Sequence, residues 1–187
     1  MNNKQTYWTG IIGIILFAVA AVVGGMLVPD YDPISQLISE SYAVDTEYGI
    51  YLRFLAYLPS GLLIAWFCFS ARKYFPRTRG LNAGFLGVGI FYGLATVMVA
   101  LFPCDAGCNK ELIDPSISQL IHSLVGLLTY LFVPICLMII GWELNKLEGD
   151  KAFQSVFSRS RNPDFRTRVA FACHAAIGLC WAYSTYC

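Results

Sequence analysis

The chain has 187 residues, of which 57% are hydrophobic and 13% charged, and its formal net charge is +1. A water-soluble domain of this size carries about 25% charged residues, so the composition excludes a surface that faces only water. The near-neutral charge gives no argument for a nucleic-acid partner. Much of the surface must therefore face a lipid bilayer.

Apolar residues gather in blocks, each close to the roughly 20 residues that a helix needs to cross a bilayer. The blocks are Tyr7–Val28, Gly49–Ser70, Gly80–Phe102, Ser118–Trp142 and Val169–Cys187. A spanning segment must satisfy its own backbone hydrogen bonds, which favours helices. The first block is longer than the core of a cleaved signal peptide, so we expect it to be retained. The sequence predicts one all-α domain over residues 1–187, a polytopic membrane helix bundle of about five spans.

The connections between the blocks alternate in charge, which predicts the orientation in the membrane. Segments 29–48 and 103–117 are mainly acidic, whereas segments 71–79 and 143–168 are rich in Lys and Arg. Because short basic loops stay on the cytoplasmic side, we expect a cytoplasmic amino terminus and two acidic connections outside.

A polar phrase occurs twice, as DPISQLISE from Asp32 to Glu40 and as DPSISQLIHS from Asp114 to Ser123. Each copy follows an outward-going block and precedes an inward-going one, which is typical of a parallel internal repeat of helix pairs. Asp-Pro followed by Ser favours a helix start at each copy. Two amphipathic helix caps at the membrane boundary would explain both copies without any ligand.

Two ionisable residues lie about one turn inside a predicted span, and such residues raise a functional hypothesis. They are Arg53 and His122, and Ser118 shares a helix face with His122 because the two are four residues apart. We expect them to contribute to an outward-facing polar pocket for a lipid or small molecule. Simple interfacial anchoring would explain Arg53 equally well. The full set of candidate binding residues is His122, Ser118, Arg53, Asp105, Ser35 and Glu40.

Cys104 and Cys108 lie in PCDAGC, within a connection expected outside, where disulfides persist. Gly107 would help this short segment to fold back. A metal site is the alternative, but C-x₃-C lacks the second pair of ligands that would make its spacing diagnostic. We therefore predict a disulfide and neither a metal nor another cofactor.

The motifs YDPIS at Tyr31–Ser35 and FPCD at Phe102–Asp105, with His122 at the start of the fourth block, form a recognisable pattern. It resembles the prokaryotic membrane family known as domain of unknown function 998, over about residues 7–142. The resemblance implies a multi-pass protein of the cytoplasmic membrane and no established reaction. Family members usually have about six spans, one more than the blocks seen here.

Three functions remain open at this point. The first is the binding module described above. The second is a zinc-dependent intramembrane hydrolase, because Ser118-x₃-His122 looks like an element of the alkaline ceramidase superfamily. Zinc catalysis needs about three protein ligands, and the later His-x₃-His pair of that superfamily is absent because residue 178, four beyond His174, is Gly. The third is an accessory subunit with unknown protein partners, since the glycines of Gly80–Phe102 permit close helix packing. Whether the protein is an enzyme stays open.

Overall fold

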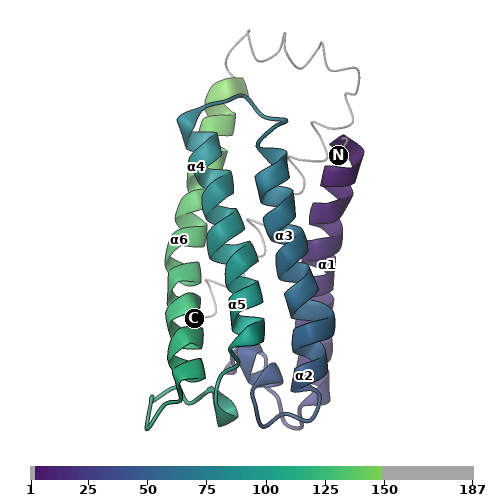
Figure 1. The fold of residues 1–187 in the computed structure, drawn as a ribbon, viewed down its shortest axis with the longest axis vertical. Helices are drawn as coiled ribbons and strands as arrows, with labels where there is room; N and C mark the ends of the chain where they lie inside the picture. The colour runs from purple at the N-terminus through teal and green to yellow at the C-terminus, as the bar shows by residue number, and fades with distance from the viewer. Residues whose placement is uncertain (1–2, 149–187) are drawn as a thin grey trace.

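The structure is a computed structural model, and it describes residues 3–148 (Figure 1). These residues form helices and short connections, which confirms the predicted all-α class. The predicted fifth span, with His174, lies outside the described residues.

Four long apolar helices, each long enough to cross a membrane, overlap the first four predicted blocks. The first is α1 (Asn3–Leu27) and the last is α6 (Ile117–Glu148). The second runs through α2 (Gly49–Leu52), the π-helical segment η2 (Arg53–Tyr57) and α3 (Leu58–Ala71). The third runs through α4 (Arg79–Val88), the π-helical segment η3 (Gly89–Leu94) and α5 (Ala95–Leu101).

The π-helical segment η2 lies where the sequence interrupts regular hydrogen bonding. Pro59, two residues beyond the end of η2, has no backbone N–H to donate to the preceding turn. A π-helical turn re-pairs the backbone around such an interruption, and these turns occur often at functional sites. Pro134 lies inside α6, which continues through it.

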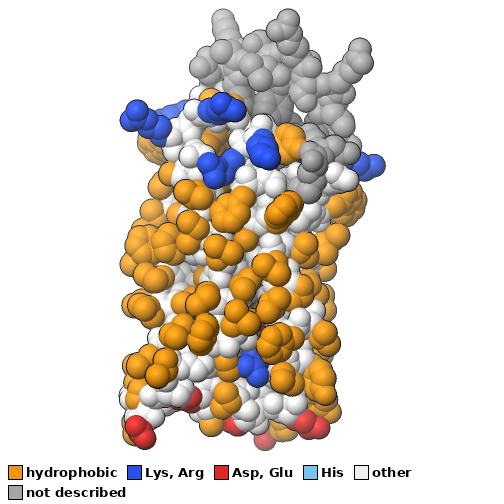
Figure 2. All heavy atoms as spheres, viewed as in Figure 1, with side chains coloured by type: hydrophobic (Ala, Val, Ile, Leu, Met, Phe, Trp, Pro, Cys, Tyr) orange, Lys and Arg blue, Asp and Glu red, His pale blue; other side chains and the backbone are white. Residues whose placement is uncertain are grey.

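The helices pack side by side with α3 and α5 between α1 and α6 (Figure 1). A band of hydrophobic side chains covers the face drawn in Figure 2, with most Lys and Arg beyond one edge and Asp and Glu beyond the other. Exposed residues such as Ile15 (57%), Leu55 (71%) and Leu127 (63%) belong to the apolar surface. Such an exposed apolar surface suits a lipid environment. We call the two ends of the bundle the acidic end, with residues 28–48 and 102–116, and the basic end, with residues 72–78.

Glycines bring the second and third spanning helices into backbone contact. A Cβ atom added to Gly93 would lie 2.6 Å from the backbone nitrogen of Ala65, and one added to Gly61 would lie 2.7 Å from the carbonyl oxygen of Gly93. Two other glycines of the third helix, Gly84 and Gly87, face Ile140 and Cys136 of α6. The small residues therefore serve packing within the chain, as in many membrane bundles.

This packing gives a prediction for a single added methyl group. Gly93→Ala should lower the free energy of unfolding by on the order of 1 kcal/mol. The new Cβ would overlap backbone atoms of Ala65, which cannot rotate away as a side chain can. Gly126→Ala is the matched control, since nothing lies within 4 Å of its Cβ position. Thermal unfolding in detergent, followed by circular dichroism, should show a loss for the first variant alone. Equal behaviour of the two variants would contradict the close crossing.

Candidate functional site

The two acidic connections pack on each other and close the acidic end of the bundle. Val44 N–H donates to the Cys104 carbonyl at 3.1 Å, and Gly107 N–H donates to the Asp45 carboxylate at 3.3 Å. Ala43, Cys104 and Cys108 form a small buried cluster between the connections. The segments before the second and fourth helices therefore form one cap.

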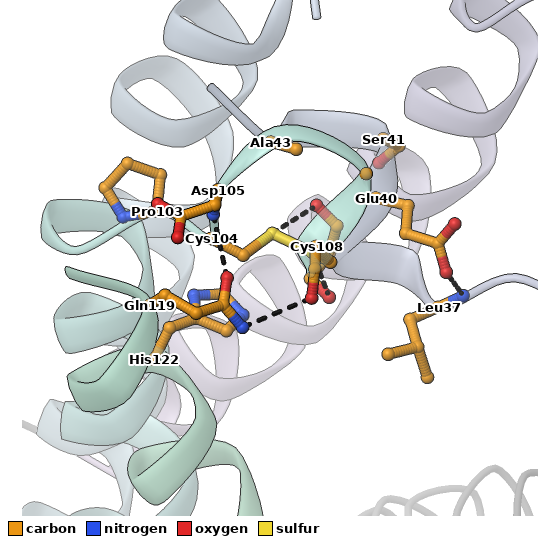
Figure 3. The surroundings of a disulfide bond; sticks show 12 residues. Leu37, Glu40, Ser41, Ala43, Pro103, Cys104, Asp105, Cys108, Gln119 and His122 are labelled. Atoms are coloured by element: carbon orange, nitrogen blue, oxygen red, sulfur yellow. Dashed lines mark hydrogen bonds between the residues drawn. A yellow bond between two sulfur atoms is a disulfide. The ribbon is translucent and has the colours of Figure 1, made fainter. Parts of the chain in front are cut away.

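Cys104 and Cys108 form a disulfide at the centre of this cap, with Cα atoms 4.8 Å apart (Figure 3). Both are buried, at 0% and 4% exposure. Gly107 has φ +58°, a left-handed conformation that glycine adopts readily. Cys108 and Asn109 also have positive φ, which costs free energy for residues with a side chain. The contacts of the cap therefore stabilise residues 107–109 in a backbone conformation that is unfavourable for an isolated peptide.

The second copy of the phrase begins α6, as the sequence predicts. Ser116 caps the helix by accepting the Gln119 N–H at 3.0 Å, and Ser116 Oγ–H donates to Asp105 Oδ1 at 2.5 Å. The Ser116 N–H also donates to Asp105, and these bonds lower the pKa of the Asp105 carboxyl below its ordinary value. The candidate Asp105 is thus a structural partner of the helix start.

Gln119 links α6 to both sides of the disulfide, and sequence reasoning missed it. Its side-chain oxygen accepts the Asp105 N–H at 2.8 Å, and its amide donates to the Cys108 carbonyl at 3.2 Å (Figure 3). The residue is 2% exposed. The signal that could have revealed it is its presence in both copies of the phrase, where the equivalent residue is Gln36.

The prediction of a helix start is wrong for the first copy. Asp32 accepts the Ile34 N–H and the Ser35 Oγ–H, which closes a turn, and only then does the short 3₁₀ helix η1 (Ile38–Tyr42) begin. Asp and Ser side chains compete with helix formation by such local bonds. The bond from Ser35 to Asp32 lowers the pKa of Asp32, and it holds the candidate Ser35 on the exposed surface.

Equivalent positions of the two copies meet at the disulfide. Ser39 and His122 both follow the shared S-Q-L-I. Ser39 Oγ lies 3.2 Å from Cys108 Sγ and the Ser39 carbonyl oxygen lies 3.5 Å from Cys104 Sγ. One ring nitrogen of His122 and the two sulfur atoms lie within 4.8 Å of one another. The repeated phrase therefore contributes one residue from each copy to the surroundings of the disulfide.

His122 and Ser118 each bond a carbonyl of the preceding connection. His122 Nδ1 lies 2.9 Å from the Phe102 carbonyl oxygen, and Ser118 Oγ–H donates to the Pro103 carbonyl at 2.6 Å. The His122 ring also lies 6.3 Å from the ring of Tyr42. The structure thus brings both candidates to the cap, where these bonds orient them and do not pair them as nucleophile and base.

Glu40 forms an ion pair with Lys110 at 2.8 Å and joins the two connections a second time. Its carboxylate also accepts the Leu37 N–H at 2.8 Å and is bonded by the Gln36 amide. Burial opposes ionisation of Glu40, but these partners outweigh it and hold its pKa below the ordinary value of 4.5. The ionised form is the one that stabilises the cap.

This pKa shift predicts an acid-sensitive contribution to stability. Because the pKa is lowered on folding, the contribution is complete above pH 4.5 and is lost as the pH falls through the depressed value. At pH 7, Glu40→Gln should lower the free energy of unfolding by about 1 kcal/mol, and the difference should shrink as the pH falls below 4.5. Unfolding in detergent at pH 7 and at a series of lower pH values measures this. Glu111→Gln, at an exposed position of the other acidic connection, should cost nothing at any of these pH values. A pH-independent effect of Glu40→Gln would refute the assignment.

Arg53 lies at the start of η2, inside the second spanning helix, and is half-buried. Its Nε–H donates to the Gly49 carbonyl at 3.3 Å, one turn earlier in the helix. Neither of the two ion pairs among the described residues includes it. A guanidinium at this depth without a carboxylate partner is uncommon in a spanning helix.

Two cavities that described residues line are located at the basic end. One, of about 370 Å³, lies between α1 and α3 beside Lys4 and Trp8. The other, of about 530 Å³, is bordered by Arg72, Arg77 and Phe85. No candidate binding residue lines either one.

The fold and the cap together define a polytopic helical membrane protein whose two acidic connections pack on each other at one end, with a disulfide inside the second of them. The chain belongs to the family described as "Protein of unknown function (DUF998)", whose model matches residues 11–183. This match confirms the resemblance seen in the sequence and extends it past residue 142. Comparison with curated proteins and with solved structures gives no significant match.

Proposed function

We propose that the protein binds an anionic ligand, chiefly the phosphate of a lipid headgroup, at the acidic end of the bundle, and that this end faces the extracytoplasmic side of a prokaryotic cytoplasmic membrane. The charge of the connections supports the orientation, because short basic loops stay in the cytoplasm. The ligand would lie at the boundary between the cap and the lipid.

The setting of Arg53 carries this proposal. Its guanidinium is half-buried, bonds one backbone carbonyl and is in neither ion pair of residues 3–148. Guanidinium groups bind phosphate through charge-assisted and often bidentate hydrogen bonds. A phosphate at the depth of Arg53 would balance its charge where the helix meets the headgroups. The candidates Ser118 and His122 would line the side of the binding site that faces the cap.

The test is retention of lipid by purified protein. Native mass spectrometry after extraction from nanodiscs that contain phosphatidylglycerol should show bound lipid, and Arg53→Ala should reduce it about tenfold, since a hydrogen bond to a charged group contributes about 1.5–3 kcal/mol. Arg72→Ala, which removes a cation at the basic end, is the matched control. Competition by free glycerol phosphate distinguishes a soluble ligand from a lipid. Unchanged retention in the Arg53 variant would refute the proposal.

A further inference from the structure

The cap brings together three side chains that bind soft metal ions. Sulfur atoms of Cys104 and Cys108 and a ring nitrogen of His122 lie within 4.8 Å of one another. All three residues are buried, at 0%, 4% and 9% exposure. The cysteines come from the connection and the histidine from α6, so the fold assembles the cluster (Figure 3). The short C-x₃-C spacing alone showed only two of the three.

The hydrogen bond of His122 fixes the tautomer of its ring. The Phe102 carbonyl oxygen can only accept, so Nδ1, 2.9 Å away, carries the proton. The lone pair is then on Nε2. Histidines that bind metals commonly donate their other ring N–H to a backbone carbonyl or carboxylate, which fixes the orientation of the ring.

The oxidation state of the cysteines decides whether sulfur can bind a metal. In the disulfide, neither sulfur is a thiolate. A dithiol reductant would break the S–S bond and supply two electrons and two protons, giving two thiols while the reductant forms its own disulfide. A metal ion then replaces the two thiol protons, because thiolates are the ligands.

The cap would keep the two thiols in place after reduction. Gln119 bonds the backbone at Asp105 and at Cys108, on both sides of the turn, and these bonds do not involve sulfur. Ser39 lies against both sulfur atoms, and its hydroxyl can donate to a thiolate. A ligand set held by independent contacts loses less conformational entropy on binding.

We propose that Cys104, Cys108 and His122 form a metal site of the Cys₂His type, open to Zn²⁺ in the dithiol state and closed in the disulfide state. Two thiolates and one imidazole match the preference of zinc, and three protein ligands leave one position for a further ligand. The site would be controlled by thiol redox chemistry. It does not depend on anion binding at Arg53, and lipid retention does not report on it.

The experiment uses the full chain with its five other cysteines replaced by alanine, namely Cys68, Cys136, Cys173, Cys180 and Cys187. The purified protein is divided into an oxidised sample and a sample reduced with a dithiol, then exposed to Zn²⁺ or Co²⁺ without oxygen. The reduced sample should hold about one zinc ion per chain and give a thiolate-to-cobalt absorption band. The oxidised sample should do neither. Equal metal content in both samples, or no metal in the reduced one, overturns the proposal.

Variants separate the histidine from adventitious binding. His122→Ala should weaken zinc binding by more than about 100-fold, because loss of an outer-shell partner alone costs 10- to 100-fold. His174→Ala, at the only other histidine of the chain, should change nothing. Retained affinity in the His122 variant overturns the proposal. Should that variant fail to fold, the imidazole protons of His122 must be paramagnetically shifted in the cobalt-loaded parent protein, and unshifted resonances give the same negative answer.

Discussion

Replacement of Gln119 by alanine should lower the free energy of unfolding by about 3 kcal/mol, because it leaves buried backbone groups of the cap without partners. The Asp105 N–H and the Cys108 carbonyl both bond the Gln119 side chain, which is 2% exposed. Each buried group left unsatisfied costs about 1–3 kcal/mol. Thermal or denaturant unfolding in detergent measures the loss.

The first copy of the phrase supplies the matched control. Gln36 occupies the equivalent position and makes comparable bonds, accepting the Asp32 N–H and donating to Glu40, but Asp32 is exposed to water. Water can replace the lost partner there, so Gln36→Ala should cost less than about 1 kcal/mol. Hydrogen exchange should show faster exchange over residues 103–116 in the Gln119 variant only. An equal loss of stability in the Gln119 and Gln36 variants would contradict the claim that burial makes the Gln119 hydrogen bonds more important.

Removal of the disulfide should have the second largest effect. The double variant Cys104→Ser with Cys108→Ser should be less stable by about 2 kcal/mol, the chain-entropy value for so short a closed loop. The loop is short because the cysteines are 4 residues apart. Cys108 and Asn109 have unfavourable positive φ angles, and the disulfide is one of several contacts that hold this backbone, together with the bonds from Gln119.

Reduction provides the control for this variant. A membrane-permeable phosphine should lower the unfolding temperature of the parent protein toward that of the double variant, and it should leave the double variant unchanged. The buried free cysteines Cys68 and Cys136 remain in both proteins, so they cannot account for a difference. A parent protein that is unaffected after complete reduction would contradict a stabilising role for the bond.

The helices were predictable because a membrane imposes a strong constraint on composition. Runs of about 20 apolar residues can satisfy their backbone only as helices, and neither register nor side-chain detail matters to that inference. The π-helical segments η2 and η3 were not predicted. Pro59 lies next to the first of them and could have indicated it, but η3 contains no proline, and its glycines Gly89 and Gly93 lie against the second spanning helix.

Part of the candidate site was predictable from the sequence, but its hydrogen-bond partners were not. His122, Ser118 and Asp105 do come together at the cap, since each lies close to the same end of a spanning block. The partner of Ser116 could not be foreseen. Asp105 takes the role that Asp32 has in the first copy, whereas Asp114, which the sequence alignment suggests, lies at φ +46°. Asp105 replaces Asp114 as the partner of Ser116 because of the way the connection folds back, and the pattern of polar residues in the sequence does not predict this.

The contact between Gly61 and Gly93 limits how the bundle can move. A methyl group on Gly61 would collide with the Gly93 carbonyl, and one on Gly93 would collide with the Ala65 nitrogen, so neither a file of water molecules nor a lipid tail fits between these two helices at that depth. The second and third spanning helices should therefore move together as one rigid body. Any movement of helices against one another would therefore occur where α1 packs on α3 and where α6 packs on α4 and α5.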